Sequence, residues 1–230
     1  YMKQNPNPFA LMAEGIRILG EKGPKIIKDL SQYGWYTDGS ITPREVIEFG
    51  NKIEEGNIEY IDRYLSDYYI EIVDEIEKKL IRNNPKREDL FKEAFRNYHL
   101  KNYSSSIALL LTQVDGICYD KTKKMFFSNN KKLSRKRVYK PEIQESLMKT
   151  SNEIIQIILT PINDSTLINE HFDNLKKYPV RLNRHEILHG VDINYGTKLN
   201  SLKIISLVNY IDDITDHYIE DITTPNTVYN

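Results

Sequence analysis

The segment 183–190, NRHEILHG, holds the side chains of this sequence that are best suited to chemistry. Within it, His185, Glu186 and His189 form the pattern H-E-x-x-H. Histidines four residues apart share one face of a helix and can bind one Zn²⁺, while the intervening Glu serves as general base. A third ligand would have to come from further along the chain, where the candidates are Asp212, Asp213 and Glu220.

Two features make a zinc hydrolase the less favoured interpretation of this segment. Zinc proteases usually offer an edge strand that holds the substrate peptide, and this sequence contains little that resembles a strand. Gly190 follows His189 directly and is expected to end the helix there. The pattern H-E-x-x-H fixes only three positions, so it also arises by chance.

The same segment contains Arg184 and His189 in the spacing R-x4-H. Five residues turn a helix by about 500°, which leaves the two side chains roughly 140° apart. They can converge only if Arg184 lies at the start of the helix, where its long side chain can bend inward. Such a pair suits RNA cleavage without a metal, because His can exchange a proton with the reacting oxygens while Arg holds the phosphate. His185 would add a polar group near the same phosphate.

A basic block spans 121–140, KTKKMFFSNNKKLSRKRVYK, with nine Lys and Arg and no Asp or Glu. The whole chain has a formal net charge of −1, so the remainder is acidic. The block could meet RNA phosphates, and Phe126, Phe127 and Tyr139 could stack on unpaired bases. A solvated loop is the competing interpretation. The predicted RNA-binding residues are Lys121, Lys123, Lys124, Lys131, Lys132, Arg135, Lys136, Arg137 and Lys140.

The R-x4-H spacing, with a polar residue after the Arg and Gly190 after the His, resembles the signature of the HEPN superfamily (higher eukaryotes and prokaryotes nucleotide-binding). The segment 90–119 is similar to the opening helical hairpin of bacterial members, and 183–210 to their motif turn and final core helix. The N-terminal part, including 34–69, resembles uncharacterised bacterial proteins of the same layout. Two positions depart from the pattern: His185 replaces the more usual Asn, and Val191 replaces the Tyr of members that are modified by nucleotide transfer.

The resemblance implies a bundle of four or five helices that dimerises, so that two R-x4-H segments line one cleft. It implies a metal-independent endoribonuclease without cofactor, of the kind found in toxin systems and phage defence, with RNA, a second copy and an antitoxin or defence protein as partners. Arg184 would bind phosphate, His189 would be the catalytic His, and His185 would be its polar neighbour. Many members are silent and only bind RNA or a protein, so this alternative stays open.

The elements that must position these residues are predicted to be helices. Thr42 and Glu45 form a capping box around Pro43, and apolar residues then recur at helical spacing in one stretch after another. The predicted helices are 43–55, 58–83, 87–100, a segment from 102 or 104 to about 117, 141–158 with a break at 161–164, a short 170–177, 184–189 and 197–220. Short strands near 34–36 and 124–127 are weakly indicated.

Two of these helices carry predictions about the core. Leu90, Phe91, Ala94, Phe95 and Tyr98 are expected to face inward from 87–100, and the last helix is apolar on nearly all sides from 202 to 211, which predicts a central position. The fold class is therefore all-α: a HEPN-like helical domain at 85–230 with an N-terminal helical extension at 1–84.

Composition limits the class of protein. The chain has 230 residues, 40% of them apolar, with few Gly and Pro, which excludes collagen-like and wholly disordered chains. Cys118 stands alone, so no internal disulfide is expected. No apolar stretch is long enough for a membrane span and the first ten residues lack a signal core, so we expect a cytoplasmic protein.

His99, His171 and His217 are expected to be structural, whereas Gln113 and Asp115 could orient His189 or Arg184.

Overall fold

The computed structural model describes residues 8–37, 39–129, 140–147, 152–163 and 165–219, and within them the protein is all-α. No β-strand occurs in this part of the chain, only two isolated bridges. The α-helices are α1 (Pro8–Gln32), α2 (Pro43–Glu54), α3 (Ile58–Asn83), α4 (Glu88–His99), α5 (Tyr103–Thr122), α6 (Glu153–Ile158), α7 (Thr160–Asn163), α8 (Arg184–Leu188) and α9 (Lys198–His217). Three short 3-10 helices complete them: Pro85–Arg87, Glu142–Ser146 and Phe172–Lys177.

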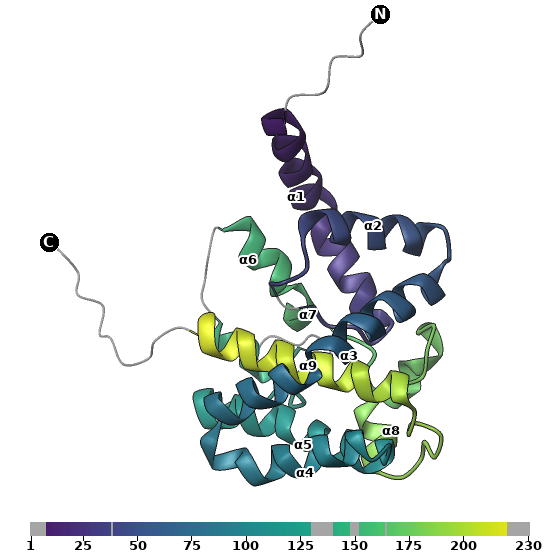
Figure 1. The fold of residues 1–230 in the computed structure, drawn as a ribbon, viewed down its shortest axis with the longest axis vertical. Helices are drawn as coiled ribbons and strands as arrows, with labels where there is room; N and C mark the ends of the chain where they lie inside the picture. The colour runs from purple at the N-terminus through teal and green to yellow at the C-terminus, as the bar shows by residue number, and fades with distance from the viewer. Residues whose placement is uncertain (1–7, 38, 130–139, 148–151, 164, 220–230) are drawn as a thin grey trace, which may run out of the picture.

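Helix α9 lies at the centre of the molecule, as predicted from its apolar sequence. Every side chain from 201 to 212 is buried. Helices α3 and α5 pack against it and α4 covers α5 (Figure 1). Ion pairs fix the directions: Asp62 of α3 meets Lys203 near the start of α9 and Lys79 meets Asp213 near its end, so α3 and α9 run parallel.

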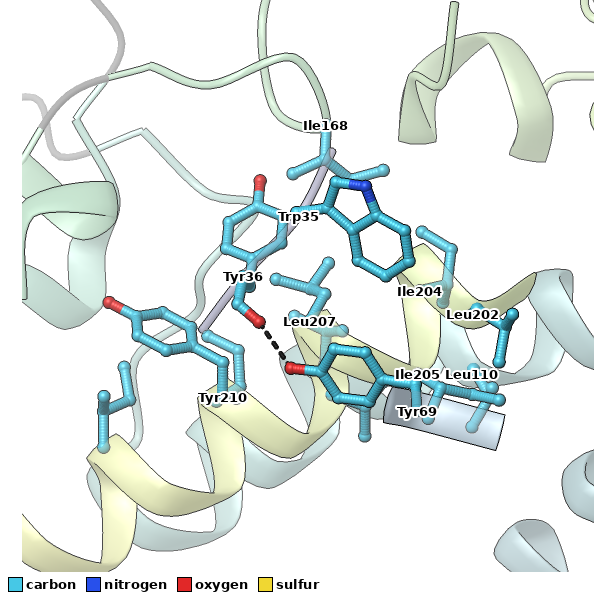
Figure 2. Packing of buried hydrophobic residues seen from close by; sticks show 14 of the residues in the cluster. Trp35, Tyr36, Tyr69, Leu110, Ile168, Leu202, Ile204, Ile205, Leu207 and Tyr210 are labelled. Atoms are coloured by element: carbon cyan, nitrogen blue, oxygen red, sulfur yellow. Dashed lines mark hydrogen bonds between the residues drawn. The ribbon is translucent and has the colours of Figure 1, made fainter. Parts of the chain in front are cut away.

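Aromatic residues join the N-terminal helices to this core. Two residues separate the end of α1 from Trp35 and Tyr36, which are about 1% exposed. Trp35 stacks on Tyr69 of α3, with ring centroids 5.7 Å apart, and the Tyr69 hydroxyl donates a 2.8 Å hydrogen bond to the carbonyl oxygen of Tyr36. Figure 2 shows the rings of Trp35, Tyr36 and Tyr69 grouped with Leu207 and Tyr210 of α9. The buried residues between Leu19 and Leu80 therefore belong to one hydrophobic core with the rest of the described chain.

Several helix ends lie where capping residues, Gly and Pro in the sequence predicted them. The Thr42 hydroxyl accepts from the Glu45 amide, and the Glu45 carboxylate accepts from the Thr42 amide, which confirms the capping box at the start of α2. Gly56, at φ +70°, separates α2 from α3. Pro85 follows the end of α3, and the hairpin of α4 and α5 is joined by three residues.

Helix α1 was not predicted. Its sequence includes Pro24, which cannot donate the hydrogen bond to the preceding turn. Packing against α2, α6 and α7 compensates for that loss, with Ile26, Ile27 and Leu30 buried.

The prediction of one helix over 141–158 is wrong. Residues 142–146 form a 3-10 helix, and α6 begins only after Asn152, whose side chain accepts from the amides of Ile154 and Ile155. The helix break predicted at 161–164 is also wrong for residues 161–163, which belong to α7. Pro161 lies in the first turn of that helix, where its missing N–H is not needed. Asp164 lies outside the described residues.

Smaller corrections concern strands, one short helix and one side chain. Residues 34–36 and 124–127 form no strand, since the aromatic residues among them pack against helices. The short helix expected over 170–177 is a 3-10 helix from Phe172 to Lys177. Leu90 is 41% exposed rather than inward, because the buried stripe of α4 is centred on Phe91, Ala94 and Phe95. Cys118 is buried on α5.

Within the described residues, no helix combines the length and apolar character that crossing a bilayer requires.

Candidate functional site

Helix α8 carries the R-x4-H residues, and Asn183 holds it in place. The Asn183 side-chain oxygen accepts from the amides of His185 and Glu186, which caps the helix. Its amide nitrogen donates to the carbonyl oxygens of Leu167 and Glu170, at 2.9 and 3.0 Å. One fully buried side chain therefore attaches α8 to the segment 165–171. Asn183 was missed in the sequence, although Asn before a short helix is a recognised capping signal.

Arg184 is the first residue of α8, the position that convergence with a histidine requires. Its guanidinium lies over the ring of Phe127, with Cζ 5.2 Å from the centroid, an arrangement that favours a cation. The Nε atom is buried and has no hydrogen-bond partner within the described residues. Phe127 was predicted to stack on bases, but Arg184 occupies its face instead.

Asp115 of α5 interacts with both Phe127 and Arg184. Its carboxylate accepts from the Phe127 amide at 2.8 Å. Burial raises the pKa of Asp115, while the hydrogen bond from Phe127 and the charge of Arg184 act in the opposite direction. Asp115 thus positions the residue on which Arg184 rests. Gln113, the other residue considered for that role, accepts from the Arg87 guanidinium at 3.1 Å instead.

The two histidines of α8 lie side by side. The ring centroids of His185 and His189 are 4.3 Å apart and both residues are exposed. Desolvation and, after it, the positive neighbours His189, Arg184 and His171 lower the pKa of His185. His189 caps the C-terminal end of α8, and Gly190, at φ +70°, ends the helix as predicted.

An open pocket of about 200 Å³ lies beside Arg184 and His185. His189 is not among the residues that line it. The other side of the pocket comes from the segment 168–171, and its lining residues are Phe127, Ile168, Asn169, Glu170, His171, Arg184 and His185. Asn169 and Glu170 were not predicted and His171 was expected to be structural, because only the tertiary fold brings these residues next to α8.

Glu170 is a buried carboxylate at this pocket, and its own segment satisfies it. Burial raises its pKa, but hydrogen bonds outweigh that effect and lower the pKa of Glu170 to about 2. The donors are the side chains of Lys177, Asn174, Ser165 and Tyr178 and the amide of His171. The Glu170 carboxylate therefore holds residues between 165 and 178 together through these hydrogen bonds.

Among the described residues, no third candidate ligand lies close enough to share an ion with His185 and His189. The Glu186 carboxylate takes two hydrogen bonds from Arg181, at 3.0 and 3.1 Å. Asp212 and Asp213 are paired with other helices, through Asn84, Lys121 and Lys79, and Glu220 lies outside the described residues. In the described part of the chain, the group of possible ligands close enough to share an ion is Asp74, Glu77 and His99, on α3 and α4.

The described part of the basic block is largely engaged within the molecule. Lys121 pairs with Asp212 and Asp216, Lys124 pairs with Glu145, and Lys140 donates to the carbonyl oxygen of Asn163. Lys123 is exposed beside the Tyr119 ring. Phe126 is fully buried and so cannot stack on a base. The other predicted residues lie outside the described ranges: Lys131, Lys132, Arg135, Lys136, Arg137 and Tyr139.

A search of protein-family models, curated proteins and solved structures finds no match to this chain.

Proposed function

We propose that this protein is a metal-independent endoribonuclease of the HEPN type. One observation carries the proposal: two exposed imidazoles lie side by side next to a guanidinium whose Nε has no hydrogen-bond partner in the described part of the chain. In this proposal Arg184 binds an RNA phosphate, and His185 and His189 transfer protons. The setting we propose is a toxin or phage-defence system, with an antitoxin or defence protein as partner.

Two adjacent imidazoles can serve as base and acid in RNA cleavage. One takes the proton from the 2′-hydroxyl, and the 2′-oxygen then attacks the neighbouring phosphorus. The bond from phosphorus to the 5′-oxygen breaks, and the leaving oxygen takes a proton from the other imidazole. The products are a 2′,3′-cyclic phosphate and a 5′-hydroxyl. Arg184 opposes the negative charge that grows on the phosphate during the attack.

His185 is suited to the role of the base. Its lowered pKa favours the neutral imidazole, the form that can accept a proton. His185 also lines the pocket with Arg184, whereas His189 does not. We therefore propose the acid role for His189.

The proposal includes a second copy of the chain. Val191 and Ile193, directly after the histidines, are 61% and 82% exposed. We infer that a second copy covers these two side chains, since exposed apolar surface rimmed by polar residues is a feature of interaction sites. A two-fold contact through this loop would bring two α8 segments together and deepen the shallow site of one protomer.

RNA cleavage in EDTA tests the proposal. The protein is incubated with unstructured and structured RNAs, and the products are examined for a 2′,3′-cyclic phosphate. We expect cleavage that His189→Ala and His185→Ala each reduce by at least about 100-fold, while His99→Ala, at an exposed histidine of α4, leaves it unchanged. Cleavage that EDTA abolishes and Zn²⁺ restores would contradict the proposal, and so would intact RNA with a folded dimer.

A silent HEPN module that binds RNA or a protein is the second candidate, because His189 does not line the pocket that Arg184 borders. It predicts RNA binding whose log affinity falls steeply with log salt concentration, with no product at any pH. His189→Ala would then leave the affinity unchanged.

A further inference from the structure

The pocket beside α8 combines two nitrogen donors without acceptors. Arg184 Nε and Asn169 Nδ2 are both buried and neither has a hydrogen-bond partner within the described residues. Asn169 is 9% exposed, and both residues line the pocket. Buried N–H groups without an acceptor are costly, so a pair of them at one opening is unusual.

The orientation of the Asn169 amide is fixed by its neighbours. Its oxygen accepts a 2.7 Å hydrogen bond from the Thr166 amide. A flipped amide would place two N–H groups against that donor, so the nitrogen must be on the other edge. The amide nitrogen of Asn169, a residue that lines the pocket, is therefore a buried donor without an acceptor among the described residues.

The groups around the pocket are suited to an anion. Arg184 carries a fixed positive charge, and the imidazoles of His185 and His171, which also line the pocket, can donate ring N–H hydrogen bonds. The one carboxylate in the lining, Glu170, is already satisfied by five donors, one of them the ammonium of Lys177 at 2.6 Å. Asp115 interacts with Arg184 from the α5 side.

We propose that this pocket binds a phosphate group, with Asn169 Nδ2 and Arg184 Nε as its buried donors and with His171 and His185 at its rim. The inference deepens the proposed function and rests on it for the source of the phosphate, an RNA strand. It adds Asn169 and His171 to the site, two residues outside the R-x4-H segment. The phosphate can be a diester within the strand or a monoester at its end.

Binding of three probes tests this inference: inorganic phosphate, the dinucleotide ApA and its 5′-phosphorylated form, each titrated against the full chain by calorimetry. Asn169→Asp is the decisive variant, since it keeps the acceptor for the Thr166 amide and replaces the donors by a carboxylate oxygen. We expect it to weaken phosphate binding by at least about tenfold. Asn194→Asp, which makes the same charge change on the exposed loop after α8, is the matched control and should bind as the parent chain does.

Arg184→Lys provides a second variant in case Asn169→Asp does not fold. It keeps the positive charge but removes Nε, and it should also weaken binding. Tighter binding of the phosphorylated probe than of ApA identifies a terminal phosphate, and equal binding identifies the diester. No saturable binding by the parent chain, or equal binding by the parent chain and Asn169→Asp, overturns the inference. Phosphate binding without RNA cleavage would instead contradict only the proposed function.

Discussion

The imidazole rings of His185, in α8, and of His189, the residue that caps its C-terminal end, lie with their centroids 4.3 Å apart. A proton on the His189 ring disfavours a proton on the His185 ring, and this effect adds to the desolvation that lowers the pKa of His185. Arg184 acts on His185 in the same direction with a fixed positive charge.

The first prediction concerns the titration of this pair. The pKa of His185 should lie below its ordinary value of 6.5, and His189→Ala should raise it, because the substitution removes a positive neighbour. NMR titration of the imidazole C–H signals measures both values directly and needs no substrate. A His185 pKa that is unchanged in His189→Ala would contradict the coupling.

A second prediction concerns assembly. Ile193→Asp should shift the chain from dimer to monomer, because it places a carboxylate at the centre of the proposed contact. Analytical ultracentrifugation over a range of concentrations measures this. Ile154→Asp, at an Ile of α6 that is 52% exposed, is the matched control and should leave the dimer intact. If the parent chain is monomeric at every concentration, the proposed contact does not exist.

The third prediction concerns Asn183. Asn183→Ala removes the cap of α8 and leaves the carbonyl oxygens of Leu167 and Glu170 without their donor. We expect the free energy of unfolding to fall by about 2–4 kcal/mol. Asn102→Ala makes the same substitution at the start of α5, where the side chain makes no capping hydrogen bond, and should cost less than about 0.5 kcal/mol. Chemical denaturation measures the unfolding free energy of both variants. Equal losses would show that the four hydrogen bonds of Asn183 contribute no more to stability than the Asn102 side chain does.

The fourth prediction is the acid sensitivity that Glu170 confers. Its folded pKa of about 2 lies below the ordinary value of 4.5, so its ionised form stabilises the fold above pH 4.5. That contribution should be lost as the pH falls from 4.5 towards 2. Glu170→Gln should lower the melting temperature at pH 7 and flatten its decline over this pH range, whereas Glu55→Gln, at an exposed residue of α2's end, should do neither. Parallel melting curves for the parent chain and Glu170→Gln would be the contrary result.

A fifth prediction compares two leucines. Leu110→Ala on α5 opens a cavity in the core, where Leu110 is fully buried, and should cost about 2–5 kcal/mol of unfolding free energy. Leu90→Ala on α4, where the side chain is 41% exposed, should cost less than about 1 kcal/mol. Urea titration measures both values. A large loss for Leu90→Ala would mean that a partner covers α4.

The sequence by itself determined the helical class and most helix ends, because these depend on local chemistry. A capping box at Thr42, the left-handed glycines Gly56 and Gly190 and the apolar run of α9 act within a few residues of where they occur. The position of Arg184 at the start of α8 likewise depends on neighbouring residues and was predicted from the sequence.

Only the tertiary structure decided what surrounds Arg184. Phe127 lies 57 positions earlier in the chain, and Asn169 and His171 belong to an irregular segment whose conformation no periodicity predicts. Their approach depends on Asn183 reaching back to the carbonyl oxygens of Leu167 and Glu170, and on Asp115 holding the Phe127 amide. Contacts over such separations depend on how the helices pack, and packing is a property of the whole chain rather than of any segment. For the same reason, the sequence could identify Lys121 and Lys124 as cations but not their pairing with Asp216 and Glu145.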